Sequence, residues 1–233
     1  MNKPVCAVVG VGPGNGAAIA RKFAAQGYAV ALCARSLDKL EVLAAELPAA
    51  AAFVYDVTDP QAAGWVFAEI EQKLGPVSVV AYNAGSGIWG RLDDVSVEAF
   101  QSSWEVNTRG LFLAVKAVLP QMRRLGGGAI VVSGATASVR GGLETTAFAS
   151  AKAAQRSLTQ SLAKQFGPEK IHVGYVVLDG MVDLERTMER MPDKPLDFFL
   201  SSEQIAEAVY YLATQPERAW TFEMDLRPYG EKW

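Results

Sequence analysis

Short apolar segments alternate with longer amphipathic segments along this chain. The apolar segments are nearly continuous in hydrophobic residues, as in strands that are covered on both faces of a sheet. They predict β-strands at 5–9, 29–34, 52–55, 77–82, 130–133, 173–178 and 222–226. The segments between them have helical periodicity, so strands and helices alternate along most of the chain.

Recognisable start signals precede several of the predicted helices. Ser36 stands at the N-cap of one helix, and Asp59-Pro60 supplies an N-cap and a first-turn proline for the next. Ser201 with Gln204 forms a capping-box pattern ahead of the last helix. Alternating strands and helices predict βαβ units with right-handed crossovers. We therefore expect an α/β fold, a doubly wound parallel sheet of about seven strands with helices on both faces, in a single domain over 1–233.

One long connection interrupts the regular pattern. Residues 181–200, between the sixth predicted strand and the last helix, contain Pro192, Pro195 and a mixture of charges. Long connections at the carboxyl edge of a parallel sheet often carry function. We expect segment 181–200 to be irregular and to act as a substrate-side flap.

The composition narrows the range of partners. Half of the residues are hydrophobic, 20% are charged and the formal net charge is −3, which suits a packed globular domain. No cluster of basic residues exceeds Arg123-Arg124, which argues against a nucleic-acid partner. No apolar run reaches the roughly 18 residues that a bilayer-spanning helix needs. The N-terminus lacks the features of a signal peptide, so we expect a cytoplasmic protein with no membrane partner.

The sequence offers little for metal or triad chemistry. Cys6 and Cys33 lie in two predicted strands and are expected to be buried thiols in a reducing compartment. His172 is the single histidine and stands at the start of a predicted strand. Neither a GxSxG motif nor a metal-ligand spacing is present, so we expect no metal and no Ser-His-Asp triad.

A glycine-rich turn joins the first predicted strand to the first helix. Glycines permit a tight turn and a close approach of the backbone to a pyrophosphate, and the helix N-terminus offers free N–H groups to it. The position within a βαβ unit makes the pattern indicative of a Rossmann-type dinucleotide site. The expected phosphate-binding residues are Gly10, Gly12, Gly14, Asn15 and Gly16.

The ends of the next two strands bear on the choice of nucleotide. Arg35 and Ser36 follow the second strand, where an acidic residue would bind the ribose 2′-hydroxyl of NAD. A basic residue beside a hydroxyl suits the 2′-phosphate of NADP instead, so we expect NADP, with NAD as the alternative. Asp56-Val57 ends the third strand, and the carboxylate is a candidate acceptor for the adenine amino group.

Five ordered motifs resemble the short-chain dehydrogenase/reductase family over nearly the whole chain. They are the glycine spacing, Asn83-Ala84-Gly85, Asn107, Lys152 and the pair Gly180 and Val182. The resemblance implies that 83–85 lines the cofactor and that Asn107 relays protons through water. It also implies that Lys152 holds the nicotinamide ribose, and that the turn at Gly180 and Val182 contacts the carboxamide.

The same resemblance exposes departures at the two residues that handle the substrate oxygen. Phe148 stands four residues before Lys152, where the family has its proton-donating tyrosine. Ala135 stands where the family has a serine, with Ser133 close by. Thr145 occupies the position that carries tyrosine in enoyl reductases, so that variant does not apply.

These departures leave three functions open. The first is an NADP-dependent oxidoreductase for a small carbonyl or alcohol substrate with displaced proton chemistry. The acid would then be a hydroxyl of Ser133, Thr145, Thr146 or Tyr82, or a water held by Asn107 and Lys152. The second is an NADP(H)-binding sensor or partner protein with little turnover. The third is an enzyme of another class, such as a lyase or epimerase, because a fold does not fix a function.

The resemblance also implies a homodimer or homotetramer. The implied subunit face consists of the helix that carries Lys152 and the helix that carries Leu111, Phe112, Val115 and Val118. Trp89, Phe100 and Trp104 are interpreted as core or subunit contacts, with an apolar substrate pocket as the alternative.

Overall fold

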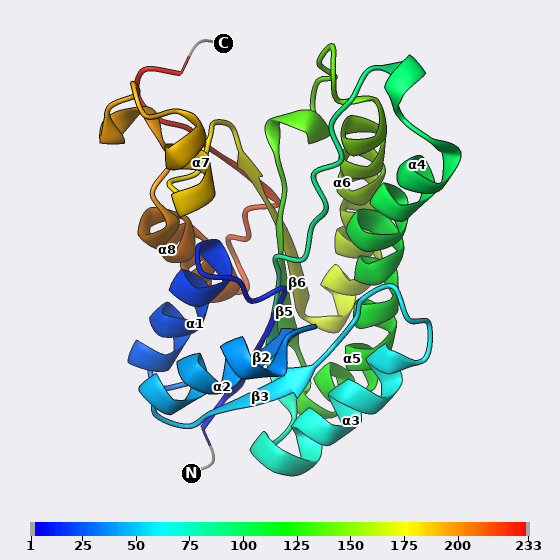
Figure 1. The fold of residues 1–233 in the computed structure, drawn as a ribbon. Helices are drawn as coiled ribbons and strands as arrows, with labels where there is room; N and C mark the ends of the chain where they lie inside the picture. The colour runs from blue at the N-terminus through cyan, green and yellow to red at the C-terminus, as the bar shows by residue number, and fades with distance from the viewer. Residues whose placement is uncertain (1–2, 232–233) are drawn as a thin grey trace.

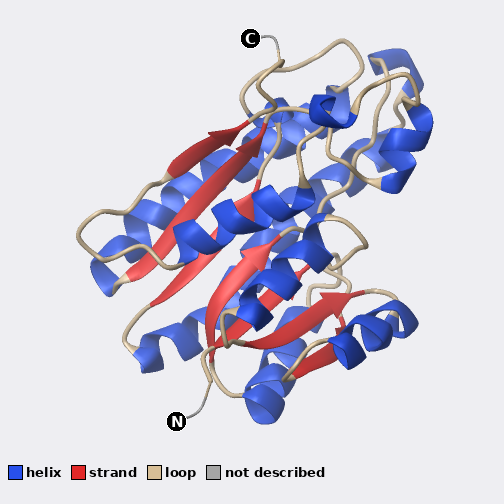
Figure 2. Ribbon diagram, turned by 90° about the vertical axis from the view of Figure 1, so that its left-hand side faces the viewer, coloured by secondary structure: helices blue, strands red, loops and turns tan. Residues whose placement is uncertain are grey.

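A seven-stranded parallel sheet forms the centre of the protein, in a computed structural model that describes residues 3–231. The strand order is β3-β2-β1-β4-β5-β6-β7, and every neighbouring pair is parallel. Figure 2 shows the strands side by side between helices. The strands are β1 (Val5–Val9), β2 (Ala29–Ala34), β3 (Ala50–Val54), β4 (Val77–Tyr82), β5 (Gly128–Ser133), β6 (Ile171–Leu178) and β7 (Glu223–Leu226).

Helices cover both faces of the sheet (Figure 1). One face carries α1 (Asn15–Ala25), α2 (Leu37–Glu46) and α8 (Ser202–Ala213). The other face carries α3 (Ala62–Leu74), α5 (Gly110–Leu125) and α6 (Thr146–Phe166), with α4 (Val97–Trp104) packed beside α6. The expected doubly wound architecture is confirmed.

Alternate residues of each central strand pack against opposite helical layers. Val5, Ala7 and Val9 of β1 belong to the core on the side of α3 and α5. Cys6 and Val8 belong to the core on the side of α1 and α8. All five residues are fully buried, and this burial on both faces is why the strand is a continuous apolar run in the sequence.

The two cysteine thiols are buried, as expected. Desolvation raises the pKa of both Cys6 and Cys33, which keeps the thiols protonated and unreactive at neutral pH.

The predicted strand ends are close to the observed ones, but the predicted caps are only partly right. Ser201 Oγ accepts a hydrogen bond from the backbone N–H of Gln204, as expected. Ser36 is at the N-cap of α2 without a side-chain capping bond. Asp59 accepts a hydrogen bond from the N–H of Gln61, so it caps a turn just before α3.

Segment 181–200 is more regular than predicted. It contains α7 (Glu185–Arg190) and a 3-10 turn at Leu196–Phe198. Its two ends are joined by a parallel bridge between Val182 and Leu200. Asp183 Oδ1 accepts hydrogen bonds from Ser202 N and Oγ at 3.0 and 2.6 Å, which fixes the base of the segment to the start of α8.

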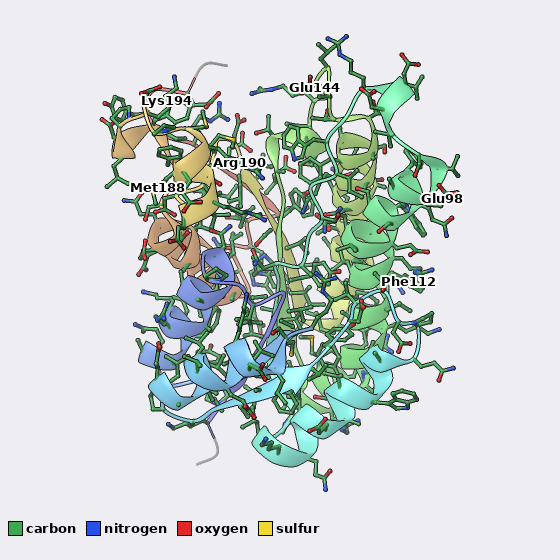
Figure 3. All side chains as sticks on the ribbon, in the orientation of Figure 1. Glu98, Phe112, Glu144, Met188, Arg190 and Lys194 are labelled. Carbon is green, nitrogen blue, oxygen red and sulfur yellow. The ribbon has the colours of Figure 1, made fainter. Side chains whose placement is uncertain are left out.

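Two helices, α5 and α6, correspond to the predicted subunit face, and most of the apolar residues of α5 face inward. Leu111, Val115 and Val118 lie in the core. Phe112 is 48% exposed and lies on the outer side of the helical layer, away from the sheet (Figure 3). The assembly therefore stays a prediction, with a smaller apolar surface on α5 than the sequence suggested.

Candidate active site

The chain reverses its direction across the sheet between β1 and β4, and the glycine turn lies at this switch point. Asn83 N donates to Val9 O at 2.8 Å, and Asn83 Nδ2 donates to Gly10 O at 2.9 Å. Gly10 has a φ of +92°, and a side chain there would overlap the backbone of Ala84. These contacts fix the predicted 83–85 motif beside the glycine turn, where parallel α/β sheets bind ligands.

The remaining residues of the turn fit a phosphate group. A Cβ on Gly16 would lie 2.7 Å from Gly10 O, so the helix packs closely on the strand end. The space around Gly12 is open, since no heavy atom lies within 4 Å of the position of a Cβ. Asn15 Oδ1 is buried without a hydrogen-bond partner in the described part of the chain. A bound polar ligand would supply hydrogen-bond partners for the open backbone, for the start of the helix and for the unpartnered Asn15 Oδ1.

Segment 181–200 reaches the same turn. A Cβ on Gly14 would overlap Leu184 Cδ2, and Ser202 Oγ would lie 3.6 Å away. Leu184 immediately precedes α7, so the segment predicted to be a flap contacts the predicted phosphate-binding turn directly. The sequence did not indicate this contact.

The residues predicted to determine the preference for NADP or NAD lie at the ends of β2 and β3. Arg35 and Ser36 are exposed. Partial burial raises the pKa of Asp56, but hydrogen bonds from the N–H and hydroxyl of Thr58, together with the Arg35 charge, outweigh it and leave the pKa below its usual value. The Val57 side chain is buried against Gly110, so only its backbone is available to a ligand.

Asn107 lies in a π-helical turn, Glu105–Arg109, that joins α4 to α5. Its side-chain Nδ2 donates to Ser86 O at 3.0 Å and to Ser103 O at 2.8 Å. A π turn replaces i→i+4 hydrogen bonds by i→i+5 bonds and often marks a functional position. The fully buried Asn107 is therefore held next to the turn that follows β4.

Lys152 is buried at 5% exposure on the inner side of α6. Its Nζ donates to Ser133 O at 2.9 Å and to Gln155 Oε1 at 3.0 Å. It also lies 3.8 Å from the position of a Cβ on Gly85. Desolvation lowers the pKa of Lys152 from 10.5 to about 7. The structure thus brings Lys152, Asn107 and Gly85 together with the backbone carbonyl of Ser133.

Phe148 lies one helical turn before Lys152 and packs against Trp89, with ring centroids 5.6 Å apart. Trp89 is therefore a neighbour of the site and not a core residue, since it is 61% exposed. Trp104 and Phe100 on α4 are also partly exposed, at 43% and 45%.

Two of the hydroxyls considered as alternative acids are engaged elsewhere. Tyr82 is fully buried and donates to Val106 O at 2.8 Å inside the core, so including it among the candidates was wrong. The Thr145 hydroxyl donates to Gly142 O at 3.0 Å and accepts from Gly142 N at 2.7 Å. The candidate acids that remain are the hydroxyls of Ser133 and Thr146 and a water held by Asn107 and Lys152.

The turn after β6 carries a buried carboxylate that sequence reasoning did not use. Asp179 Oδ1 accepts from Thr136 Oγ1 at 2.7 Å and from Arg140 at 3.1 Å, and Asp179 is 3% exposed. These bonds join the turn at Gly180 to the loop that follows β5. Pro228 packs against Gly180, while Val182 pairs with Leu200.

His172 has a structural environment, as expected. Its ring stacks on Trp220 with centroids 4.9 Å apart, and Nε2 bonds Thr221 O at 3.0 Å. Among residues 3–231, no group of three or more His, Cys, Asp or Glu side chains is arranged to hold a metal ion. None of the helices within that range is long and apolar enough to cross a membrane.

Comparison with known proteins adds to this geometry. A family model described as short chain dehydrogenase matches residues 4–195. The chain is 38% identical over 184 residues to a probable galactose dehydrogenase of Rhizobium meliloti (strain 1021), covering 77% of this chain and 72% of the relative. An alcohol dehydrogenase from the archaeon Thermococcus sibiricus, solved with 5-hydroxy-NADP, is 32% identical with a TM-score of 0.87 over 99% of both chains.

A short-chain oxidoreductase from Pseudomonas aeruginosa PAO1, described as containing an atypical catalytic center, shares the fold. Its TM-score is 0.90 at 22% identity, over 99% of this chain and 98% of that one. The family model covers most of the chain, and the glycine turn sits at the switch point of the sheet. On these grounds the chain belongs to the short-chain dehydrogenase/reductase family of NAD(P)-dependent oxidoreductases.

Proposed function

We propose that this protein binds NADP(H) in preference to NAD(H) and acts on a small carbonyl or alcohol substrate without the usual tyrosine–serine pair. The observation that carries the proposal is the open glycine turn beside Asn83, with Arg35 exposed at the end of the neighbouring strand. The 5-hydroxy-NADP complex of the Thermococcus sibiricus relative supports the choice of nucleotide.

The chain's own residues have distinct roles in this proposal. The pyrophosphate is held by the glycine turn, which consists of Gly10, Gly12, Gly14, Asn15 and Gly16. The 2′-phosphate is held by Arg35 and Ser36. The adenine end is held by Asp56 and Val57. The 83–85 turn, Lys152 and the Gly180–Val182 turn hold the nicotinamide end. A bound nicotinamide nucleotide supplies the hydride chemistry, and the protein supplies position and electrostatics.

Proton supply is the step that distinguishes this protein. Phe148 and Ala135 carry no ionisable proton, so Ser133, Thr146 or a water at Asn107 and Lys152 must serve a substrate that needs one. Loss of a general acid costs typically 10²–10⁴-fold in rate. We therefore expect slow reduction of simple ketones and faster reduction of substrates whose oxygen needs little protonation.

A second function is favoured by one specific observation. Lys152 Nζ already has two acceptors inside the protein, Ser133 O and Gln155 Oε1. A lysine engaged in this way suits a protein that binds NADP(H) as a sensor or partner subunit with little turnover.

Fluorescence titration with NADPH and NADH, followed by NADPH oxidation against a carbonyl panel, tests both functions. Tighter NADPH binding with measurable oxidation is the expected result. Tight binding without turnover on any carbonyl would favour the sensor function. Absence of binding by either nucleotide would overturn the assignment of this site.

A further inference from the structure

Gln155 is a fully buried amide at the centre of the candidate site. It follows Lys152 by three residues on α6, a spacing that places the two side chains on the same face of the helix. Its side chain has three partners, which come from three different elements. They are Lys152 Nζ at 3.0 Å and Tyr175 Oη at 3.4 Å, both donating to Oε1, and Asn107 O at 2.6 Å, accepting from Nε2.

These partners fix the orientation of the amide. An ammonium group and a backbone carbonyl have opposite hydrogen-bonding roles, since the first only donates and the second only accepts. A flipped amide would point its NH₂ group at Lys152 and its oxygen at Asn107 O, and both contacts would be lost. The observed orientation is therefore the one that satisfies both neighbours.

Gln155 also determines how many hydrogen bonds Lys152 has left to offer. A lysine ammonium carries three N–H donors. In the charged form, Ser133 O takes one and Gln155 Oε1 takes a second, so one remains for a ligand. Nζ lies next to Gly85, in the motif predicted to line the cofactor.

The same amide donates a hydrogen bond to the backbone carbonyl of Asn107. The site predicted for a relay water lies between Lys152 and Asn107, and Gln155 bonds both groups at once. An amide neither gains nor loses a proton near neutral pH, whereas a water can pass one on. A direct amide bridge therefore leaves the two groups connected but without a proton path through water.

We propose that Gln155 is a positioning residue that holds the Lys152 amine on the Ser133 carbonyl and closes the gap between Lys152 and Asn107 to water. The proposal rests on the proposed nucleotide site for its functional meaning. It assigns Lys152 a role in binding without a role in a proton relay: the lysine is fixed for a ligand and separated from Asn107. It also removes the water at Asn107 and Lys152 from the alternative acids and leaves Ser133 and Thr146.

The first test is a double-mutant cycle on nucleotide affinity. The variants are Lys152→Met, Gln155→Met and their combination, with NADPH binding measured by fluorescence titration. Because two residues that act through one another give non-additive effects, the double variant should bind NADPH as weakly as Lys152→Met alone. We expect Gln155→Met to raise the Kd by roughly tenfold, the equivalent of about 1.4 kcal/mol. Effects of the two substitutions that simply multiply would overturn the positioning role.

Two further variants control for a general loss of packing. Gln160→Met changes an exposed glutamine on the same helix and should leave the Kd within twofold. Gln155→Glu keeps an acceptor for Lys152 but loses the donor to Asn107 O, so NADPH affinity should be closer to the parent than in Gln155→Met. If Gln155→Glu binds NADPH as weakly as Gln155→Met does, the contact of this side chain with Lys152 does not determine NADPH affinity.

The second test concerns water, and it uses an Ala135→Ser/Phe148→Tyr background, in which a donor is present. At saturating NADPH, adding Gln155→Ala should open the gap and raise kcat for carbonyl reduction several-fold, with the KM for the carbonyl unchanged. An unchanged or lower kcat would overturn the closure of the relay.

A third measurement does not depend on nucleotide binding. Amine acetylation of Lys152, followed by peptide mass spectrometry, should be slow in the parent and several-fold faster in Gln155→Ala. Equal rates would overturn the positioning of Lys152 even if the proposed function holds. If neither nucleotide binds but Gln155→Ala speeds labelling, the proposed function fails and the role of Gln155 in fixing the lysine stands.

Discussion

The ring of Phe148 packs against the indole of Trp89, with ring centroids 5.6 Å apart and ring planes inclined by 34°. Phe148 lies near the start of α6, and Trp89 lies in the connection that follows β4. Because tyrosine differs from phenylalanine only by the oxygen at the end of the ring, the contact should survive a Phe148→Tyr substitution. This pair therefore allows a tyrosine hydroxyl to be introduced at position 148 in a folded protein.

Restoring the donor should raise turnover. We expect Ala135→Ser/Phe148→Tyr to increase kcat for carbonyl reduction with NADPH, up to the roughly 10²–10⁴-fold that a general acid provides. Phe148→Leu in place of tyrosine is the matched control and should give no increase. Steady-state kinetics and the melting temperature check the result, and a well-folded double variant with parental kcat would contradict the assignment of these two positions.

Removal of the Arg35 charge should change nucleotide preference. A charge-assisted hydrogen bond to a phosphate contributes about 1.5–3 kcal/mol, so Arg35→Ala should weaken NADPH binding by roughly 10-fold or more. NADH has no 2′-phosphate, and its Kd should change by less than about twofold. Calorimetric titration of both nucleotides separates the two cases. Equal losses for NADPH and NADH would place Arg35 away from the 2′-phosphate.

Two glycines of the turn should respond differently to alanine. A Cβ on Gly12 meets no atom within 4 Å, so Gly12→Ala should keep the melting temperature while weakening NADPH binding. A Cβ on Gly16 lies 2.7 Å from the backbone of Gly10, so Gly16→Ala should lower the melting temperature as well. Thermal denaturation with and without NADPH makes the comparison. Unchanged NADPH affinity in Gly12→Ala would place the phosphates elsewhere.

The buried Lys152 should make stability depend on pH. Its folded-state pKa is about 7 against 10.5 for the free side chain, so the unfolded chain binds more protons between these values. Stability therefore rises with pH through this range, and the full cost of burying the charge is present only below about pH 7. Relative to Lys152→Met, the parent should gain about 2 kcal/mol of unfolding free energy from pH 7 to pH 9. Urea denaturation at several pH values measures the difference, and parallel pH profiles would show that Lys152 titrates normally.

Most of the fold was predictable because its signals are local. Strands buried on both faces, such as β1, are continuous apolar runs, and their regular alternation with amphipathic helices defines the topology. Motif spacing in the sequence matches that of the family, and it identifies the glycine turn, Asn83, Asn107 and Lys152. Phe148 and Ala135 were identified in the same way, by counting from Lys152.

The role of Gln155 was not predictable, because it depends on contacts made across the fold. In the sequence it is one more polar residue on a helix, and its partners Asn107 and Tyr175 are 48 and 20 residues away. One signal was present: Lys152, Gln155 and Thr159 place polar side chains on the stripe of α6 that also buries Ala151 and Leu162. Polar residues on a core-facing stripe require partners, and those partners define the site.

The contact between Leu184 and Gly14 has a consequence for segment 181–200. A Cβ at position 14 would overlap Leu184 Cδ2, so the absence of a side chain at this glycine is what lets the leucine rest on the turn. Even a methyl group at position 14 would push Leu184 outward and, with it, the residues that begin α7.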